Sequence, residues 1–300
     1  MRPIVQFKEV HYRYRSERAA LSNVSFDIIA NRRTAIVGAN GAGKSTAVFH
    51  LNGLFQPSSG EVWFRGEPVT KRNRERMVDH VGIVFQDPDD QIISLTVYED
   101  IAFGLVQRGI AREEVDLRTQ HYLALLGITE LANRHPGELS LGQKKLVAIA
   151  GVLALETELV VFDEPMAFLD PHGKKEIQRI MEMLSEMGRT VIVTTHDMQL
   201  VAEWAEDVIV MREGACAGVM SPGELFANRS LVAQTKLELP PIAELASALW
   251  DGEPRLMPIR MEELKRWLEQ KLAANKLAPL FTEPFCISEH NSSLPLRARS

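Results

Sequence analysis

The hydrophobic residues near the N-terminus alternate with polar ones. This alternation runs through residues 4–30 and predicts strands that bury one face. Residues 61–69, EVWFRGEPV, predict a hairpin arm that turns at Gly66. The chain is therefore expected to begin with a small antiparallel β subdomain.

Further along the chain, hydrophobic residues form short uninterrupted runs. Such runs are typical of parallel strands that are buried on both faces, and here they span residues 34–37, 81–85, 159–162 and 190–194. Helical patterns lie between or beside them at residues 45–54, 113–126, 144–155 and 174–187. Strands that alternate with helices predict an α/β fold with a mainly parallel core sheet.

The spacing of these elements predicts an insertion and an extension. About 73 residues separate the strand that ends at residue 85 from the one that begins at 159, far more than one crossover needs. We therefore expect a main domain over residues 1–222, with a helical subdomain inserted at about 87–157. Residues 223–300 form a small C-terminal extension with one amphipathic helix at 261–272, and the last 20 residues are expected to be loosely ordered.

Net charge, cysteine content and the length of apolar runs indicate which partners and which compartment to expect. The net charge of −6 argues against a nucleic-acid-binding protein, because phosphate backbones require a basic surface. The two cysteines, Cys216 and Cys286, match no metal or disulfide pattern and favour a reducing compartment. The longest apolar run has ten residues, against roughly 20 for a membrane span, and the N-terminus lacks a signal-peptide core. A cytoplasmic protein is expected, with docking onto a membrane protein left open.

Residues 38–45, GANGAGKS, match the phosphate-loop pattern G-x-x-x-x-G-K-[ST] between a buried strand and a helix. Glycines let the backbone curl until its N–H groups point at phosphate oxygens. Lys44 is placed to bridge the β- and γ-phosphates, and Ser45 to offer its hydroxyl to Mg²⁺. A P-loop NTPase fold is predicted, with ATP and Mg²⁺ as ligands. The expected nucleotide-binding residues of this segment are Gly38, Asn40, Gly41, Gly43, Lys44, Ser45 and Thr46.

Two acids end the predicted strand at 159–162. Ligands of open α/β sheets gather at the carboxyl ends of the strands, so Asp163 is expected to face the phosphate loop and hold Mg²⁺ through water. Glu164 is placed to polarise the water that attacks the γ-phosphate. The alternative is that these acids only cap the next segment.

Two more polar residues follow buried strands. Gln86 and His196 say little alone, but with Lys44, Asp163 and Glu164 they collect at one sheet edge. His196 is then expected to contact the γ-phosphate and orient Glu164 and the water. Gln86 is expected to sense the metal and the nucleophile where the helical insertion begins.

In its motifs the chain resembles the ATPase subunits of ATP-binding cassette (ABC) transporters over about residues 4–222. Six motifs occur in the order of that family: GANGAGKST, VFQ, LSLGQ, LVVFDE, FLD and TTH. Tyr14 occupies the place of the aromatic residue that stacks on adenine in the family, and Tyr12 competes with it by sequence alone.

The resemblance implies a head-to-tail dimer of two ATPase subunits, either identical or paralogous. The signature segment, residues 139–145 (LSLGQKK), would then face ATP held by the other subunit. Ser140, Gly142 and Gln143 would bind its γ-phosphate, backed by the helix from Lys144. Asp170 would link the two sites across the interface.

A finer resemblance rests on residues 85–91 (FQDPDDQ), 96–104 (TVYEDIAFG) and 222–226 (PGELF). These segments are similar in sequence to those of the ATPases of energy-coupling-factor importers, including cobalt and nickel importers. It implies an integral membrane transporter component, a substrate-binding membrane subunit, and a position on the cytoplasmic face of the membrane. The extension would be a dimerisation tail.

The residues beside the expected docking groove are acidic. Asp87, Asp89 and Asp90 could pair with arginines of a membrane coupling helix, or form a solvated turn.

Four residues differ from those usual in the family. Leu141 stands in place of Gly, Leu146 in place of Arg, Met166 in place of Thr, and Phe168 in place of Gly. Other functions also remain open. These are the ATPase of another ABC transporter class, a soluble ABC-type ATPase that acts on ribosomes or DNA, and a regulatory module without turnover. The acidic charge and the single cassette disfavour the second, and the presence of Glu164 and His196 disfavours the third.

Overall fold

The computed structural model describes residues 2–14, 19–250 and 252–273. Cys286 and the last 20 residues, which are predicted to be loosely ordered, lie outside these residues. The C-terminal extension is therefore described only as far as Ala273.

An antiparallel sheet forms the N-terminal part, as predicted. Its strand order is β2-β1-β4-β5. The hairpin between β4 and β5 turns at Gly66, which adopts a positive φ of 82°. The strands are β1 (Pro3–Arg13), β2 (Ala19–Ile29), β4 (Ser59–Phe64) and β5 (Glu67–Pro68).

The second sheet has six strands in the order β10-β9-β3-β8-β7-β6. The pairs from β9 to β6 are parallel, and β10 is antiparallel to β9. Four of these strands were predicted; the hairpin of β9 and β10 was not. The strands are β3 (Arg33–Val37), β6 (Val81–Val84), β7 (Leu159–Asp163), β8 (Thr190–Thr195), β9 (Asp207–Arg212) and β10 (Ala215–Met220).

The parallel sheet separates two hydrophobic clusters. Along β7, Leu159 and Val161 join the cluster that contains the antiparallel sheet and helix α1 (Lys44–Leu51). Val160 and Phe162 join the cluster of the remaining helices. All four side chains are at most 1% exposed. This two-sided burial explains why the strand is hydrophobic at consecutive positions.

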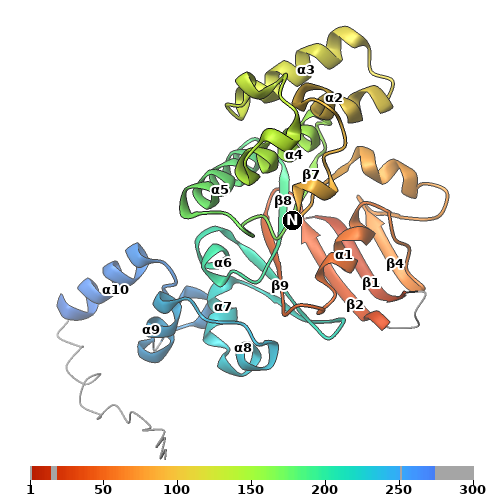
Figure 1. Cartoon of the computed structure of the whole chain (residues 1–300). Coiled ribbons are helices and arrows are strands. Elements are labelled where there is room, and N and C mark those ends of the chain that lie inside the picture. Colours follow the sequence, from red (N-terminus) through yellow and green to blue (C-terminus); the bar gives the residue numbers. More distant parts are fainter. Residues whose placement is uncertain (1, 15–18, 251, 274–300) are drawn as a thin grey trace, which may run out of the picture.

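The predicted helical subdomain lies between β6 and β7. It contains α2 (Val97–Gln107), α3 (Arg112–Leu125) and α4 (Leu141–Ala154). Figure 1 shows α2 and α3 at one extremity of the molecule, with α4 between them and the sheet. Short 3₁₀ turns lie between these elements at Pro88–Asp90, Thr129–Leu131 and Pro136–Glu138, and another, Arg74–Asp79, precedes β6.

Helix α4 begins at Leu141, three residues before the predicted start. Ser140 is its N-cap: the Ser140 side chain accepts from the N–H of Gln143, and the Gln143 side chain accepts from the N–H of Ser140. This capping box satisfies two groups that would otherwise lack partners, and it extends the helix through the signature segment. The prediction of a helix start at residue 144 was wrong for this reason.

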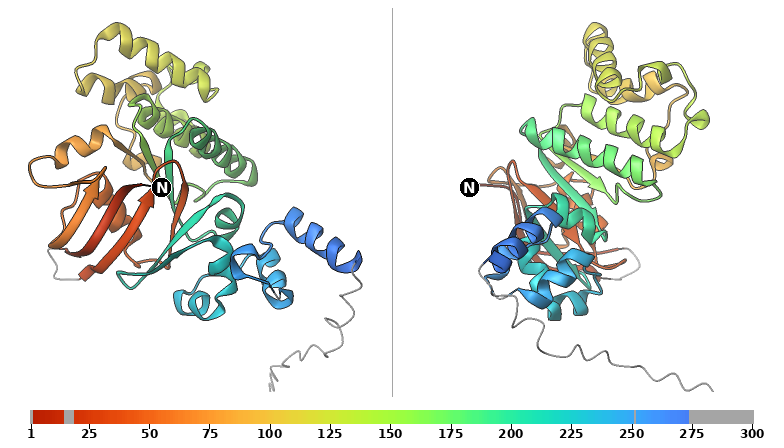
Figure 2. Two further views of the ribbon diagram at one scale, coloured as in Figure 1. Left: turned by 180° about the vertical axis from the view of Figure 1, so that it is seen from behind. Right: turned by 90° about the vertical axis from the view of Figure 1, so that its left-hand side faces the viewer.

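The C-terminal extension holds more helices than predicted. The helix at 261–272 is confirmed as α10 (Met261–Ala273). Three short helices precede it and were missed: α7 (Pro222–Ala227), α8 (Arg229–Thr235) and α9 (Pro241–Leu249). Figure 2 shows these helices at the end of the molecule remote from α2 and α3.

Two further helices, α5 (Pro171–Glu186) and α6 (Met198–Trp204), complete the fold. Across the residues that the structure describes, no helix has both the length and the apolar character that a membrane span requires.

Candidate active site

A cavity of about 740 Å³ opens at the edge of the parallel sheet where the phosphate loop lies. Residues from β1, β2, the phosphate loop and the ends of β6, β7 and β9 surround it. The lining residues are Tyr14, Ala19, Ala20, Asn40, Gly41, Gly43, Lys44, Ser45, Thr46, Gln86, Glu164, Glu213 and Gly214. Topology therefore brings together residues that are up to 200 positions apart in the chain.

The phosphate loop requires glycine at two positions. A Cβ atom on Gly38, at φ 152°, would lie 2.3 Å from the carbonyl oxygen of Met211. A Cβ atom on Gly43, at φ 102°, would lie 2.8 Å from the carbonyl oxygen of Ala20. The loop is thus packed tightly against β9 and β2, and α1 starts at its end with free N–H groups in its first turn.

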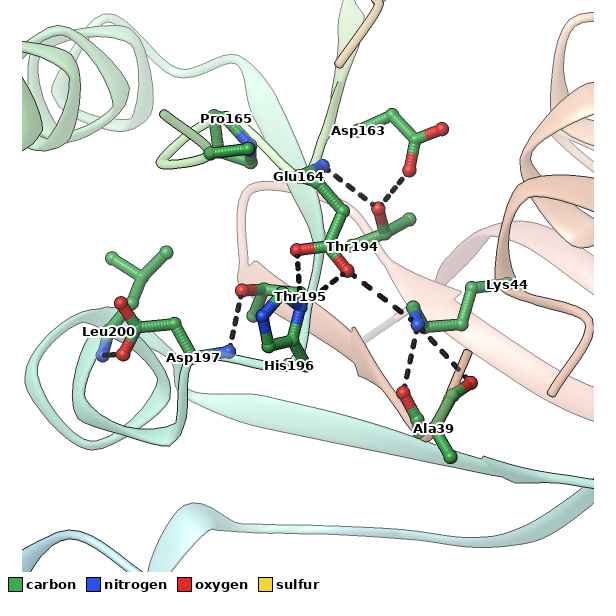
Figure 3. Close-up of polar contacts among 12 residues, drawn as sticks. Ala39, Lys44, Asp163, Glu164, Pro165, Thr194, Thr195, His196, Asp197 and Leu200 are labelled. Carbon is green, nitrogen blue, oxygen red and sulfur yellow. Dashed lines mark hydrogen bonds and ion pairs between the residues drawn. The ribbon is translucent and has the colours of Figure 1, made fainter. Parts of the chain in front are cut away.

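The ammonium group of Lys44 lies inside the loop. Its Nζ donates to the carbonyl of Gly38 at 2.8 Å and lies 3.6 Å from Oε1 of Glu164. The side chain is only 7% exposed. Figure 3 shows Lys44 pointing toward Glu164 from the opposite side of the site. Its position suits contact with the terminal phosphates of a bound nucleotide.

Glu164 and His196 form the contact that the sequence predicted. His196 Nδ1 lies 3.0 Å from Oε1 and 2.9 Å from Oε2 of Glu164 (Figure 3). Glu164 adopts a positive φ of 44°, and its N–H donates to the carbonyl of Thr194 at 3.0 Å. A left-handed backbone at a non-glycine residue persists only where its neighbours fix it, so the carboxylate is held in place.

Of the three predicted metal ligands, two line the cavity and Asp163 does not. Ser45 and Gln86 line the cavity, and Asp163 accepts a hydrogen bond from the hydroxyl of Thr194. Within the described ranges there is no cluster of three His, Cys, Asp or Glu residues that could hold a metal ion. These sparse oxygen donors fit Mg²⁺, which usually takes one or two protein ligands plus substrate phosphates and water.

The structure distinguishes the two candidate tyrosines. Tyr14 is 40% exposed and lines the cavity, and its hydroxyl lies 2.9 Å from Oγ1 of Thr46. Tyr12 instead stacks on Phe55 at a centroid distance of 4.9 Å and meets His50 edge-on. Tyr14 is therefore the ring available to a nucleobase.

The signature residues lie apart from this cavity. Ser140, Gly142 and Gln143 are not among its lining residues, although all three are at the start of α4. A Cβ atom on Gly142 would meet no heavy atom within 4 Å. The N-terminus of α4 is thus open on its own chain, which suits a ligand held by another molecule.

Asp170 and the departures after Glu164 have structural roles. Asp170 caps α5 by accepting from the N–H of Gly173 at 2.7 Å. Met166 is 7% exposed and belongs to the core. Phe168 is 79% exposed at φ 62°, a conformation that costs a non-glycine residue about 1–2 kcal/mol. Leu141 has no positive φ, so glycine is not needed there.

The acidic turn is less free than the sequence suggested. Asp87 accepts from the N–H of Asp89 at 3.0 Å, and Asp89 pairs with Nζ of Lys144 at 2.6 Å. Asp90 forms no ion pair with any described residue. Asp90, like Asp87, thus has no ion partner among the described residues and is available to an arginine of a partner.

The sequence missed four lining residues: Ala19, Ala20, Glu213 and Gly214. The last two form the turn between β9 and β10, with φ of 49° and 81°, and the N–H of Gly214 donates to the carbonyl of Ala42 at 3.0 Å. A two-residue turn that ends in glycine between hydrophobic strands was the signal that could have revealed them.

The phosphate loop after β3, the acids at the end of β7, the histidine after β8 and the helical insertion between β6 and β7 define an ATPase of the ABC class. The sequence pattern of the family described as "ABC transporter" matches residues 21–167. The energy-coupling factor transporter ATP-binding protein EcfA of Methanoculleus marisnigri is 45% identical over 247 residues, which cover 82% of this chain and 89% of the relative. The chain belongs to the ABC transporter ATPases and, within them, to the ATP-binding proteins of energy-coupling factor transporters.

Other comparisons agree with this membership. The EcfA of Carboxydothermus hydrogenoformans is 40% identical to this chain. The match covers 89% of this chain and 97% of the relative. The structure of cbiO1 from Clostridium perfringens, described as part of the ABC transporter complex cbiONQ, superposes with a TM-score of 0.70 at 38% identity. It covers 82% of this chain and 99% of its own. The structure of a dimeric ATP-binding cassette bound to ADP and phosphate superposes with a TM-score of 0.65 at 29% identity. The match covers 73% of this chain and 98% of that structure's chain.

Proposed function

We propose that this chain hydrolyses ATP with Glu164 as the catalytic base and thereby powers an importer of the energy-coupling-factor type. The observation that carries the proposal is the position of Glu164, which lines the cavity together with Lys44 and contacts both Lys44 and His196. Lys44 would neutralise the β- and γ-phosphates, Glu164 would accept a proton from the attacking water, and His196 would orient both. Tyr14 would stack on the adenine.

Mg²⁺ would be held by Ser45, Gln86 and, through water, Asp163. Bound there, the ion neutralises charge that develops on the phosphates. The hydrogen bond from Thr194 fixes the Asp163 carboxylate at the sheet edge. The protein residues thus position the ion, and the phosphates complete its ligand shell.

A second ATPase subunit would complete the site. Its α4 would present Ser140, the N–H of Gly142 and the neighbouring Gln143 to the γ-phosphate, and its Asp170 would lie near the interface. The open N-terminus of α4 and its separation from the cavity of the same chain support this arrangement. ATP would close the dimer because only the triphosphate reaches both subunits.

A membrane component would dock beside the acidic turn. Two apolar side chains shortly after this turn, Ile93 and Leu95, are 67% and 72% exposed. Together with Asp90 they offer an apolar surface with one acid at its edge, suited to an amphipathic helix that carries an arginine. The protein would thus sit peripherally on the cytoplasmic face of the membrane, beside a transporter component and a substrate-binding subunit. Transition-metal ions or vitamins are the proposed cargo.

The extension of residues 223–300 would act as a dimerisation tail. Helix α10 buries Leu264 and Trp267, whereas Met261 and Leu272 are 51% and 63% exposed. An amphipathic helix with remaining apolar exposure at the end of the fold suits contact with a second subunit.

The variant Glu164→Gln tests the hydrolytic function. It should abolish phosphate release, keep ATP binding and trap a dimer that gel filtration detects, because the base is lost while the binding groups remain. Glu176→Gln, on the exposed surface of α5, is the control and should behave as the wild type. Phosphate release by Glu164→Gln near the wild-type rate would refute the assignment.

The variant Asp90→Arg tests the docking surface separately. It should reduce co-purification of the membrane component while ATP binding survives. Undiminished co-purification would place the docking site elsewhere.

A further inference from the structure

A buried lysine connects the signature helix to the segment beside the catalytic base. Lys145 lies in the second turn of α4 and is only 3% exposed. Its Nζ donates to the carbonyl of Pro165 at 2.7 Å and to the carbonyl of Ala167 at 2.9 Å. Both acceptors belong to the segment between Glu164 and Asp170.

The segment that Lys145 contacts is a tight turn. The N–H of Ala167 donates to the carbonyl of Glu164 at 3.1 Å, and Met166 between the two acceptors is buried. One backbone hydrogen bond and one buried side chain thus hold the turn that starts at Glu164. Lys145 holds this turn at both ends of a three-residue span.

Lys145 also supplies a cation that the neighbouring position lacks. Leu146 is 6% exposed and packs in the hydrophobic core, so it offers no charge to the turn. Asp87 and Glu164 are the charged groups that favour the protonated form of Lys145. The other polar links of α4 in this region, from Lys144 to Asp89 and from Gln91 to the carbonyl of Ala148, lead to the acidic turn instead.

A packing role alone does not account for a lysine here. Burying an ammonium group is unfavourable, and a methionine of similar length would fill the space without that penalty. The lysine gains its bonds only to the two carbonyls, because no described carboxylate lies within ion-pair distance of its Nζ. What lysine offers here and methionine does not is a pair of hydrogen bonds to the turn after Glu164.

We propose that Lys145 is a positioning residue that transmits the placement of the signature helix to Glu164. When the N-terminus of α4 engages the γ-phosphate in the other subunit, the rigid helix carries Lys145 with it. The two bonded carbonyls then fix the turn, and with it the backbone from which the Glu164 carboxylate projects. The inference rests on the proposed role of Glu164 as the base.

The test compares Lys145→Met and Lys145→Arg with the control Lys175→Met, which removes an exposed lysine of α5. Phosphate release by the full chain in its ATPase-active assembly gives kcat and KM, nucleotide titration gives the Kd for ATP, and thermal unfolding reports folding. We expect kcat of Lys145→Met to fall roughly tenfold or more, because small misplacements of a catalytic group are costly. The Kd for ATP should stay within about twofold of wild type, since Lys145 touches no lining residue other than through the turn. Lys145→Arg should recover part of the loss, because guanidinium can donate to both carbonyls.

Two results would overturn the proposal: turnover by Lys145→Met within about twofold of the wild type, or equal losses in the methionine and arginine variants when both are folded. Glu164→Gln is measured in parallel. If Glu164→Gln remains active, the function of the site is wrong; if it is inactive while Lys145→Met is active, only the role of Lys145 is wrong.

Discussion

His196 Nδ1 lies 2.9 Å from Oε2 of Glu164, and the two residues follow neighbouring parallel strands, β8 and β7. Their exposures differ widely: the side chain of His196 is 66% exposed and that of Glu164 is 12%. The carboxylate is therefore shielded and fixed, whereas the imidazole can turn toward a phosphate at the open side of the site. The pair thus joins a shielded carboxylate to an accessible imidazole.

Replacing His196 should separate orientation from binding. In His196→Ala, kcat should fall by roughly 10- to 100-fold, because Glu164 and the water lose their orienting partner while Lys44 and the loop still hold ATP. The measurement is steady-state phosphate release together with a nucleotide titration. His172→Ala, at an exposed position of α5, is the matched control. A variant that loses ATP binding as much as turnover would contradict the orienting role.

The two tyrosines should respond differently to truncation. Tyr14→Ala should raise the Kd for ATP by roughly tenfold or more with little change in thermal stability, because an exposed stacking surface is lost. Tyr12→Ala should lower the free energy of unfolding by about 2 kcal/mol or more, because Tyr12 packs on Phe55 and His50. Fluorescence titration and thermal unfolding check both. If Tyr12→Ala weakened ATP binding without lowering the free energy of unfolding, Tyr12 rather than Tyr14 would be the residue that stacks on adenine.

Neighbouring substitutions in the signature segment should have opposite outcomes. Leu141→Gly should leave turnover nearly unchanged, because position 141 is helical and half-exposed. Gly142→Asp should abolish turnover, because it places a negative charge where we propose that the γ-phosphate of ATP held by the other subunit binds. An acid in the first turn favours the helix dipole, so this variant should remain folded. Phosphate release and circular dichroism test this, and equal activities would show that other groups face the phosphate.

Lys145 should make stability depend on alkaline pH. Burial lowers the pKa of Lys145 from its ordinary value of 10.5 to about 8. Between these values the unfolded chain binds more protons than the native one, so the free energy of unfolding rises as pH increases. Relative to Lys145→Met, the wild type should gain about 2 kcal/mol between pH 7 and pH 9.5.

Urea unfolding at several pH values measures this difference, because titrations shared by both proteins cancel. Lys175→Met should show no such trend relative to the wild type. If the difference in the free energy of unfolding between the wild type and Lys145→Met falls as pH rises, folding favours the charged ammonium. That result would contradict a lowered pKa of Lys145.

Local patterns were sufficient for much of the fold. The strands at residues 34–37 and 159–162 were predicted because consecutive hydrophobic residues leave no other arrangement than burial on both faces. The extension was predicted less well, since α7, α8 and α9 have only six to nine residues each. Helices this short derive their stability from tertiary packing, which leaves little periodicity to detect.

The site was predicted where chemistry follows directly from spacing, and missed where it follows from packing. The residues of the phosphate loop could be named because the motif fixes its own backbone. Glu213 and Gly214 could not, because their place beside Ala42 depends on how the β9–β10 hairpin lies against the loop. The same holds for Asp89, whose partner Lys144 is 55 residues away.

The sequence by itself determined the class of reaction and the sheet edge at which it occurs. Motif spacing and strand hydrophobicity are local properties, and parallel topology then brings the strand ends together. Only the tertiary structure decided that Tyr14 rather than Tyr12 lines the cavity and that Lys145 binds the turn after Glu164. These outcomes depend on distances between segments far apart in the chain, which packing sets and no local pattern encodes.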